Sequence, residues 1–143
     1  MSSEGILEVV NVYRAMQPDA DGLPRVGRTG RTLGIRVPTD IAPDESGAVR
    51  PGEGGMSVNP DSMWNVPSHR RPRGMGRGST GKAEDRIYSV DAGAVSSDDL
   101  SLRPDPVAAT IHAFVEPSRE MPLERYESAL FATRPSWRQD WPL

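Results

Sequence analysis

Cysteine is absent from the 143 residues of this chain, and histidine occurs only twice, as His69 and His112. Without a thiol the protein forms no disulfide and offers no thiolate to a metal ion. Neither histidine belongs to an HExxH motif or to a close pair of histidines, so zinc chemistry lacks its usual ligands. The sequence therefore predicts a protein with no metal centre.

Long hydrophobic runs are absent too. No run of about 18 apolar residues occurs, so we expect no transmembrane helix. The first ten residues, MSSEGILEVV, have an early acid and no basic region, unlike a secretory signal peptide. Together with the missing cysteines, this predicts a protein that folds in the cytoplasm of the cell that makes it. Export into the cytoplasm of a target cell, by a route that needs no signal peptide, stays open.

Lysine is almost absent: Lys82 is the single lysine, and arginine supplies the rest of the 17 basic residues. Acidic residues number 20 and the formal net charge is -3, so the global charge does not indicate nucleic-acid binding. The arginine bias has two explanations. One is a GC-rich coding sequence, and the other is a need for planar side chains that bind phosphate through two hydrogen bonds.

Apolar residues are scarce, at 36% of the chain, whereas glycine and proline contribute 14 residues each. Because both are poor in helix interiors, we expect short strands joined by long ordered loops. The length is that of one domain, predicted over residues 1–143. Its fold class is α+β, with a small mixed or antiparallel sheet, long loops and one late helix. We expect strands at 6–15, 32–37, 54–58, 86–90 and 108–115, and a short extended piece at 100–103.

The late helix is predicted over residues 122–133. Pro122 suits a first helical position, and Pro135 follows the point where the helix should end. The apolar residues recur at helical spacing and form one face, made of Leu123, Tyr126, Leu130 and Phe131. After the helix, Trp137 and Trp141 are expected to pack back on the body of the protein.

The segment 76–82, GRGSTGK, matches the GxxxxGK pattern of phosphate-binding loops. Such a loop needs Ser or Thr next, a strand before it and a helix after it, but Ala83 follows and the context is a polar loop and then a strand. We therefore interpret it as a glycine-rich loop without nucleotide-hydrolysing function. Just before it lies a basic cluster that is either a solvated loop or a substrate-contacting loop, made of His69, Arg70, Arg71, Arg73 and Arg77.

Ser57 and His112 are candidate functional residues because of the sequence around them. Ser57 follows two glycines in GGMSV, where a ligand can approach the backbone closely. A nucleophile elbow would need GxSxG, and Asn59 breaks that pattern, so a serine that orients a ligand is favoured over a hydrolase nucleophile. His112 is expected in mid-strand, with Phe114 and Glu116 on the same face. From spacing alone, a hydrogen-bonded structural histidine is the favoured interpretation.

Three stretches, in this order, resemble one family: VYRA at 12–15, GGMSV at 54–58, and the long block 98–130. In that block the matching residues are Asp99, Leu100, Asp105, His112, Pro117 and Met121. The family is the small cytotoxic effectors of the bacterial type VI secretion system, whose fold is similar to NAD-dependent mono-ADP-ribosyltransferases. The resemblance implies the ADP-ribosyltransferase-like form of an α+β fold.

The resemblance also implies roles for individual residues. Arg14, with Tyr13, corresponds to the first-strand position that holds NAD, and Ser57 corresponds to the serine of the second strand. The backbone at Gly54 and Gly55 would hold the nicotinamide or the ribose. Ser57 and His112 correspond to positions important for toxicity. Glu116 is the acid nearest to the expected catalytic glutamate, although the family pattern does not fix an acid there.

By this resemblance the protein is a bacterial toxin that transfers ADP-ribose from NAD to a macromolecule, protein or nucleic acid, in the intoxicated cell, with no metal. A cell that makes such a toxin would need an immunity protein or antitoxin. The alternative is a non-catalytic binding module of the same fold that contacts RNA or another anionic partner through its arginine-rich loop. An enzyme would depend on Ser57, whereas a binding module would not.

Overall fold

The structure is a computed structural model and describes residues 9–143. Its main element is a six-stranded sheet in which every neighbouring pair is antiparallel, in the order β5-β6-β3-β1-β4-β8. These strands are β1 (Asn11–Met16), β3 (Met56–Pro60), β4 (Arg86–Asp91), β5 (Leu100–Pro104), β6 (Ala113–Pro117) and β8 (Arg138–Trp141). A second, two-stranded sheet pairs β2 (Ala48–Val49) with β7 (Met121–Pro122).

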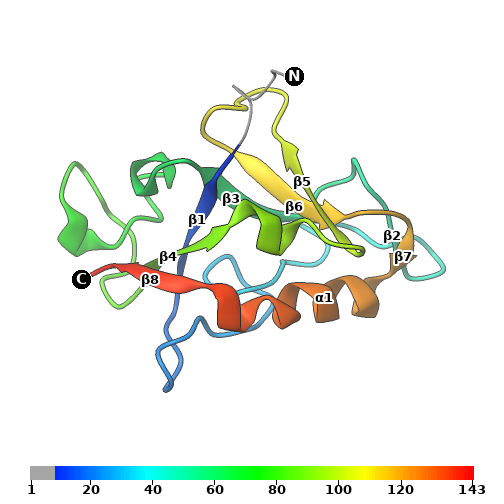
Figure 1. Ribbon diagram of the computed structural model, residues 1–143, viewed down its shortest axis with the longest axis horizontal. Helices are drawn as coiled ribbons and strands as arrows, with labels where there is room; N and C mark the ends of the chain where they lie inside the picture. The colour runs from blue at the N-terminus through cyan, green and yellow to red at the C-terminus, as the bar shows by residue number, and fades with distance from the viewer. Residues whose placement is uncertain (1–8) are drawn as a thin grey trace.

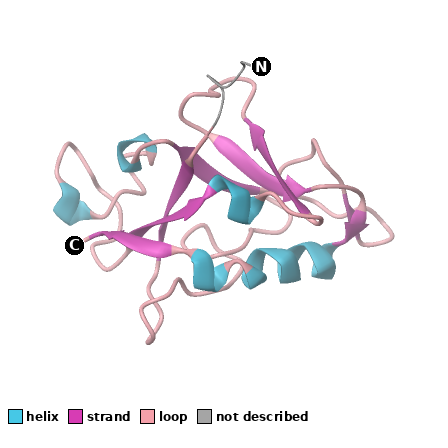
Figure 2. Cartoon of the chain, viewed as in Figure 1, coloured by secondary structure: helices cyan, strands magenta, loops and turns pink. Residues whose placement is uncertain are grey.

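One α-helix, α1 (Leu123–Ala132), runs along one face of the large sheet, and long loops join the strands (Figures 1 and 2). Four short 3-10 helices interrupt the loops, at Met63–Asn65, Arg73–Met75, Ala92–Val95 and Arg134–Ser136. The α+β class, the antiparallel sheet and the single late helix are as the sequence predicts. The helix begins one residue later than expected, because Pro122 pairs in β7 and serves as the N-cap.

The helix packs through the face that its periodicity indicates. Leu123, Tyr126 and Leu130 are buried in the main core, and Phe131 is half-buried against it. The Tyr126 hydroxyl donates to the carbonyl of Val115 and accepts from the backbone N–H of Met56 at 3.1 Å. Because Met56 and Val115 are opposite each other in β3 and β6, this hydroxyl fixes the two strands at the point where Ser57 begins to project.

The first and last strands differ in part from expectation. The strand expected at 6–15 is β1, which starts at Asn11; residues 6–8 lie outside the described residues. The tail forms β8, which pairs with β4 and was not anticipated as a strand. Trp137 is buried in the main core and Trp141 is half-buried in a second cluster, which confirms that the tail packs back.

Two strand predictions are wrong. Residues 32–37 form no strand but a turn with one isolated bridge, between Leu33 and Val26. The strand expected at 108–115 is β6, displaced to Ala113–Pro117, since residues 108–111 form a turn. That turn is closed by Asp105, whose backbone carbonyl accepts from Ala108 N–H at 3.1 Å and whose side chain accepts from Val107 N–H at 2.9 Å. His112 therefore lies just before the strand, not in its middle.

Candidate functional site

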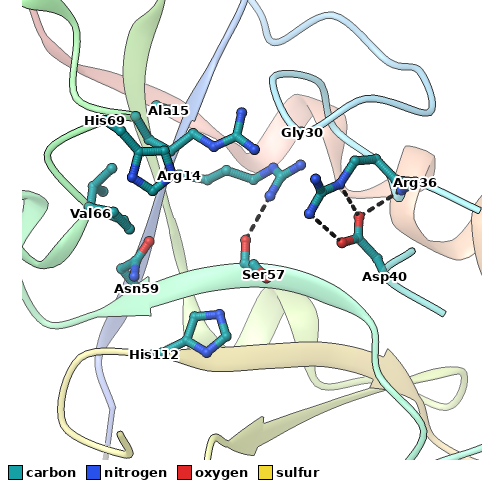
Figure 3. Close-up of a pocket in the computed structure, with 12 residues that line it drawn as sticks. Arg14, Ala15, Gly30, Arg36, Asp40, Ser57, Asn59, Val66, His69 and His112 are labelled. Atoms are coloured by element: carbon teal, nitrogen blue, oxygen red, sulfur yellow. Dashed lines mark hydrogen bonds and ion pairs between the residues drawn. The ribbon is translucent and has the colours of Figure 1, made fainter. Parts of the chain in front are cut away.

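Strands β1 and β3 pair briefly and then separate, and a cleft of about 180 Å³ lies where they part. Their register pairs are Val12 with Pro60 and Tyr13 with Asn59. In a continuous ladder Arg14 and Ala15 would lie opposite Val58 and Ser57. The cleft takes the place of those pairs, and its walls are Arg14, Ala15, Gly30, Arg36, Asp40, Ser57, Asn59, Val66, Pro67, His69, Arg70 and His112 (Figure 3).

Arg14 holds the separated strands in position. Its Nη1 donates to the carbonyl of Ser57 at 2.8 Å, as Figure 3 shows, so a side chain replaces the missing ladder contact. Its Nε and Nη2 donate to the carbonyl of Thr32 at 3.1 and 2.8 Å, which fixes the turn where a strand was expected. Nη1 carries a second N–H, for which the described residues provide no acceptor. That N–H remains for an acceptor in the cleft.

Burial makes the Arg14 charge costly. Arg14 is 7% exposed, and the hydrogen-bond partners of its side chain are neutral carbonyls rather than a carboxylate. Desolvation lowers its pKa from 12.5 to about 10, an effect that the negative charge of Asp40 partly opposes. The guanidinium therefore stays charged at neutral pH, and it destabilises the folded protein there relative to pH values above 10. Buried charges kept at such a cost often mark functional sites.

Ser57 and Asn59 project from alternate positions of β3 into the cleft. Asn59 is buried and donates from Nδ2 to the carbonyl of Ile111 at 2.8 Å, which ties β3 to the turn before His112. The Ser57 hydroxyl is half-buried and has no hydrogen-bond partner among residues 9–143. It is thus available to a ligand.

His112 and Asp105 form a hydrogen-bonded pair at the edge of the cleft. His112 Nδ1 lies 2.8 Å from Asp105 Oδ2, and the imidazole packs edge-on against the ring of Phe114, with centroids 4.7 Å apart. The Val107 N–H and the His112 ring both lower the pKa of Asp105, so its carboxylate is ionised. An ionised partner favours the tautomer with the proton on Nδ1, which leaves Nε2 as a hydrogen-bond acceptor. Figure 3 shows Ser57 between the Arg14 guanidinium and this ring.

The carboxylate that lines the cleft is Asp40, which sequence reasoning missed. It is held by Arg36, whose Nη2 and backbone N–H donate to it at 2.8 and 2.7 Å. Glu116, the acid that the sequence singled out, is buried elsewhere and accepts from Gly52 N–H and Arg103 Nε, both at 2.8 Å. The geometry gives Glu116 a structural contact and no place in the wall of the cleft.

Three other sequence candidates also lie outside the wall. Tyr13 is half-buried against the second hydrophobic cluster, on the opposite side of β1 from Arg14. Gly54 and Gly55 both have positive φ, 117° and 153°, and pack against backbone. A Cβ at Gly54 would lie 2.0 Å from the Asp40 carbonyl, and one at Gly55 would lie 2.6 Å from the Val115 carbonyl. These contacts explain both glycines without a ligand.

Residues 64–82 supply a part of the cleft that sequence reasoning left unplaced. Arg71 is buried and donates to the carbonyls of Val66 and Arg77, at 2.9 and 2.8 Å, and to Ser79 Oγ at 2.9 Å. This network folds the segment back on itself and places His69 and Arg70 at the cleft. The sequence shows that this segment is rich in arginine and glycine, but it does not show that the segment lines one cleft with Arg14 and Ser57.

The described residues give no support to three other kinds of feature: a metal site, a membrane-spanning helix and a nucleotide-binding loop. In the described part of the chain, no group of three or more histidine or acidic side chains could hold a metal ion. Among residues 9–143 no helix is long and apolar enough to cross a membrane. The segment 76–82 runs through turns into β4, without the helix that a phosphate-binding loop requires.

Comparison with known proteins identifies the family. No curated protein and no solved structure matches the chain. A family model described as "Tse2 ADP-ribosyltransferase toxin" matches residues 10–137, which include α1 and the strands β1 to β7, whereas β8 lies beyond the matched range. An ADP-ribosyltransferase takes NAD as its substrate, and the cleft of Arg14, Ser57 and His112 lies entirely within the matched residues. The chain belongs to the Tse2 family of ADP-ribosyltransferase toxins.

Proposed function

We propose that this protein transfers ADP-ribose from NAD to a macromolecule of an intoxicated cell, in the cleft between β1 and β3. The observation that carries the proposal is the convergence of Arg14, Ser57 and His112 on that cleft, within a chain of this toxin family. These residues are far apart in the sequence and belong to three different segments. Their meeting at a break in the sheet provides charge, a free hydroxyl and an oriented imidazole in one place.

The charges of the cleft suit NAD, whose pyrophosphate carries two negative charges. Arg70 lines the cleft and forms no ion pair with a described residue. Arg14 adds a buried positive charge with one spare N–H. The acid in the wall, Asp40, is already neutralised by Arg36. The cleft thus has an excess of positive charge that would attract and hold phosphate.

When NAD is bound, its nicotinamide–ribose bond breaks, the electron pair leaves on nicotinamide, and the ribose carbon bonds to a nucleophilic atom of the acceptor. The acceptor must lose a proton in this step. His112 Nε2 accepts that proton, and Asp105 stabilises the positive charge that forms on the ring. The Ser57 hydroxyl donates a hydrogen bond to the substrate, and Arg14 holds Ser57 in place through a hydrogen bond to the backbone carbonyl of Ser57. The site therefore acts chiefly by positioning and electrostatics.

The direct test is incubation of the purified protein with labelled NAD and a cell lysate. We expect label on a macromolecule with the wild type and loss of the label with Ser57→Ala and His112→Ala. Ser96→Ala is the matched control, because Ser96 is exposed and does not line the cleft. Transfer by Ser57→Ala at the wild-type rate would contradict the proposal.

A second test is growth arrest upon expression in bacteria. The same two substitutions should relieve the arrest, whereas a non-catalytic binding module would stay indifferent to Ser57. We further propose that a toxin of this kind is delivered from one cell to another and that its producer carries an immunity protein. Co-expression with the neighbouring genes of the producer, scored by restored growth, tests that part.

A further inference from the structure

A second cavity, of about 280 Å³, adjoins the cleft, and five of the eight residues that line it are charged. It shares His69 and Arg70 with the cleft, so the two are continuous along one surface. Its other walls are Arg31, Arg73, Thr80, Gly81, Lys82 and Asp85. None of these residues presents an apolar side chain, and the proposed transfer step assigns no role to Arg73 or Lys82.

The charge of this second cavity is strongly positive. Its acid, Asp85, is neutralised by Arg31, which donates to the two carboxylate oxygens at 2.6 and 2.8 Å. Arg70, Arg73 and Lys82 form no ion pair within the described residues. Residues 62–83 contain five arginines and lysines and no acid, although acids outnumber basic residues in the whole chain. The positive charge is therefore concentrated beside the cleft.

The cationic side chains stand on a fixed backbone. Arg71 holds the segment through the carbonyls of Val66 and Arg77, and Gly81 N–H donates to the Arg71 carbonyl at 2.8 Å. A Cβ at Gly81 would lie 2.6 Å from the carbonyls of Arg70 and Arg71, so only glycine permits this close packing. Arg77 in turn stacks on Trp64, with its guanidinium carbon 4.3 Å from the ring centroid.

We propose that this second cavity binds the phosphate backbone of a nucleic acid and presents it to the cleft as the acceptor of ADP-ribose. The centre of a protein–protein interface is usually apolar, whereas nucleic-acid interfaces are polar and strongly positive. A cavity that is lined by three unpaired cations and by no aliphatic or aromatic hydrophobic residue fits the second kind. That the bound nucleic acid is the acceptor depends on the proposed function, but the binding itself does not.

The binding test uses fluorescence anisotropy with a labelled single-stranded RNA and a DNA of the same sequence, over a series of salt concentrations. The double variant Arg73→Gln with Lys82→Gln removes two cations from the cavity. The matched control, Arg25→Gln with Arg138→Gln, removes the same charge from exposed sites outside both cavities.

We expect the cavity variant to bind the labelled nucleic acid roughly tenfold more weakly than the wild type does. The slope of the logarithm of affinity against the logarithm of salt concentration should become less steep by about two, which corresponds to two lost phosphate contacts. The control should bind nearly as the wild type does. Equal losses in both variants would show attraction by net charge alone and would overturn the proposal. So would tighter binding of a labelled polyglutamate, because that would indicate an acidic protein as the partner.

NAD binding, measured by calorimetry, separates this cavity from the substrate cleft. The Arg73→Gln and Lys82→Gln variant should bind NAD as the wild type does. A loss of NAD affinity with unchanged nucleic-acid binding would make the cavity an extension of the NAD site and would overturn the proposal.

The acceptor is tested by treating the labelled lysate with nuclease or with protease. We expect nuclease to remove the label, and label that only protease removes would overturn the identity of the acceptor. If the wild type transfers no label but still binds nucleic acid through Arg73 and Lys82, the proposed function fails while the binding site stands.

Discussion

Three arginine side chains hold loops in position by donating hydrogen bonds to backbone carbonyls. Arg14 donates to the carbonyls of Thr32 and Ser57, and Arg71 donates to those of Val66 and Arg77. Arg134 donates to the carbonyl of Pro24 at 2.8 Å and pairs with Asp21. In each case the planar guanidinium group holds a loop in position. Neither explanation of the arginine bias that the sequence suggested includes this structural role.

Removal of the Arg14 fork should destabilise the protein. Arg14→Gln leaves the carbonyls of Thr32 and Ser57 without donors, and we expect the free energy of unfolding to fall by about 2–4 kcal/mol. Urea unfolding measures this. Arg25→Gln, at an exposed position with no ion pair to a described residue, should change it by less than about 0.5 kcal/mol. If both variants are equally stable, Arg14 does not hold the separated strands.

Asp105 should act on catalysis through His112 alone. Asp105→Asn removes the negative charge that stabilises the protonated ring, and we expect transfer of labelled ADP-ribose to slow by about 10² or more. The pH profile of the rate should change as well, a change that a purely structural contact would not produce. In the double variant with His112→Ala, Asp105→Asn should cause no further loss. Full additivity would show that the two residues act independently.

Among the elements, the helix and the central strands could be predicted from the sequence because the patterns that indicate them lie within a few consecutive residues. The face of Leu123, Tyr126 and Leu130 is a periodic pattern within ten residues, and β1, β3 and β4 have β-branched residues. Segment 32–37 has a similar composition but forms a turn, in which the carbonyl of Thr32 accepts hydrogen bonds from the Arg14 side chain. The pairs β2–β7 and β4–β8 join short segments far apart in the sequence, so no local pattern indicated them.

Part of the candidate site could likewise be predicted from the sequence, and part could not. Arg14, Ser57 and His112 were proposed from family resemblance, and the structure brings all three to one cleft. Asp40 and Arg70 enter it from loops whose paths depend on distant contacts, which the sequence does not display. Glu116 lay close to His112 in sequence, but alternation does not predict that Arg103 and Gly52 hold it away from the cleft.

The helix face gives a stability prediction at the scale of the element. Leu130 is fully buried in the core, so Leu130→Ala should lower the free energy of unfolding by about 2–5 kcal/mol. Chemical denaturation with urea provides the measurement. Glu124→Ala, on the exposed face of the same helix, serves as the control and should change it little. A loss below about 0.5 kcal/mol for Leu130→Ala would show that this face does not support the core.

Acid should destabilise the whole molecule through its paired carboxylates. Hydrogen bonds from Arg134 lower the pKa of Asp21, those from Arg125 and Arg119 lower that of Asp99, and Val107 and His112 lower that of Asp105. A depressed folded pKa contributes stability above the unfolded value of 3.8, and this stability is lost as the pH falls through the folded values.

Urea unfolding at pH values between 7 and 2 should therefore show a loss of stability concentrated below pH 4. Asp99→Asn cannot form its ion pairs at any pH, so it should be less stable than the wild type at pH 7 and should lose less between pH 4 and pH 2. An identical acid response in the two proteins would contradict the role of these pairs.

We propose that Ser57 and His112 serve the chemistry of the cleft rather than the stability of the fold. The measurement that tests it most directly is thermal unfolding and NAD-dependent labelling of the same preparations of Ser57→Ala, His112→Ala and the control Ser96→Ala. We predict melting temperatures within about 3 °C of the wild type for all three, with labelling lost in the first two only. Full labelling by Ser57→Ala, or a loss of labelling by His112→Ala that merely follows a large fall in melting temperature, would contradict the account.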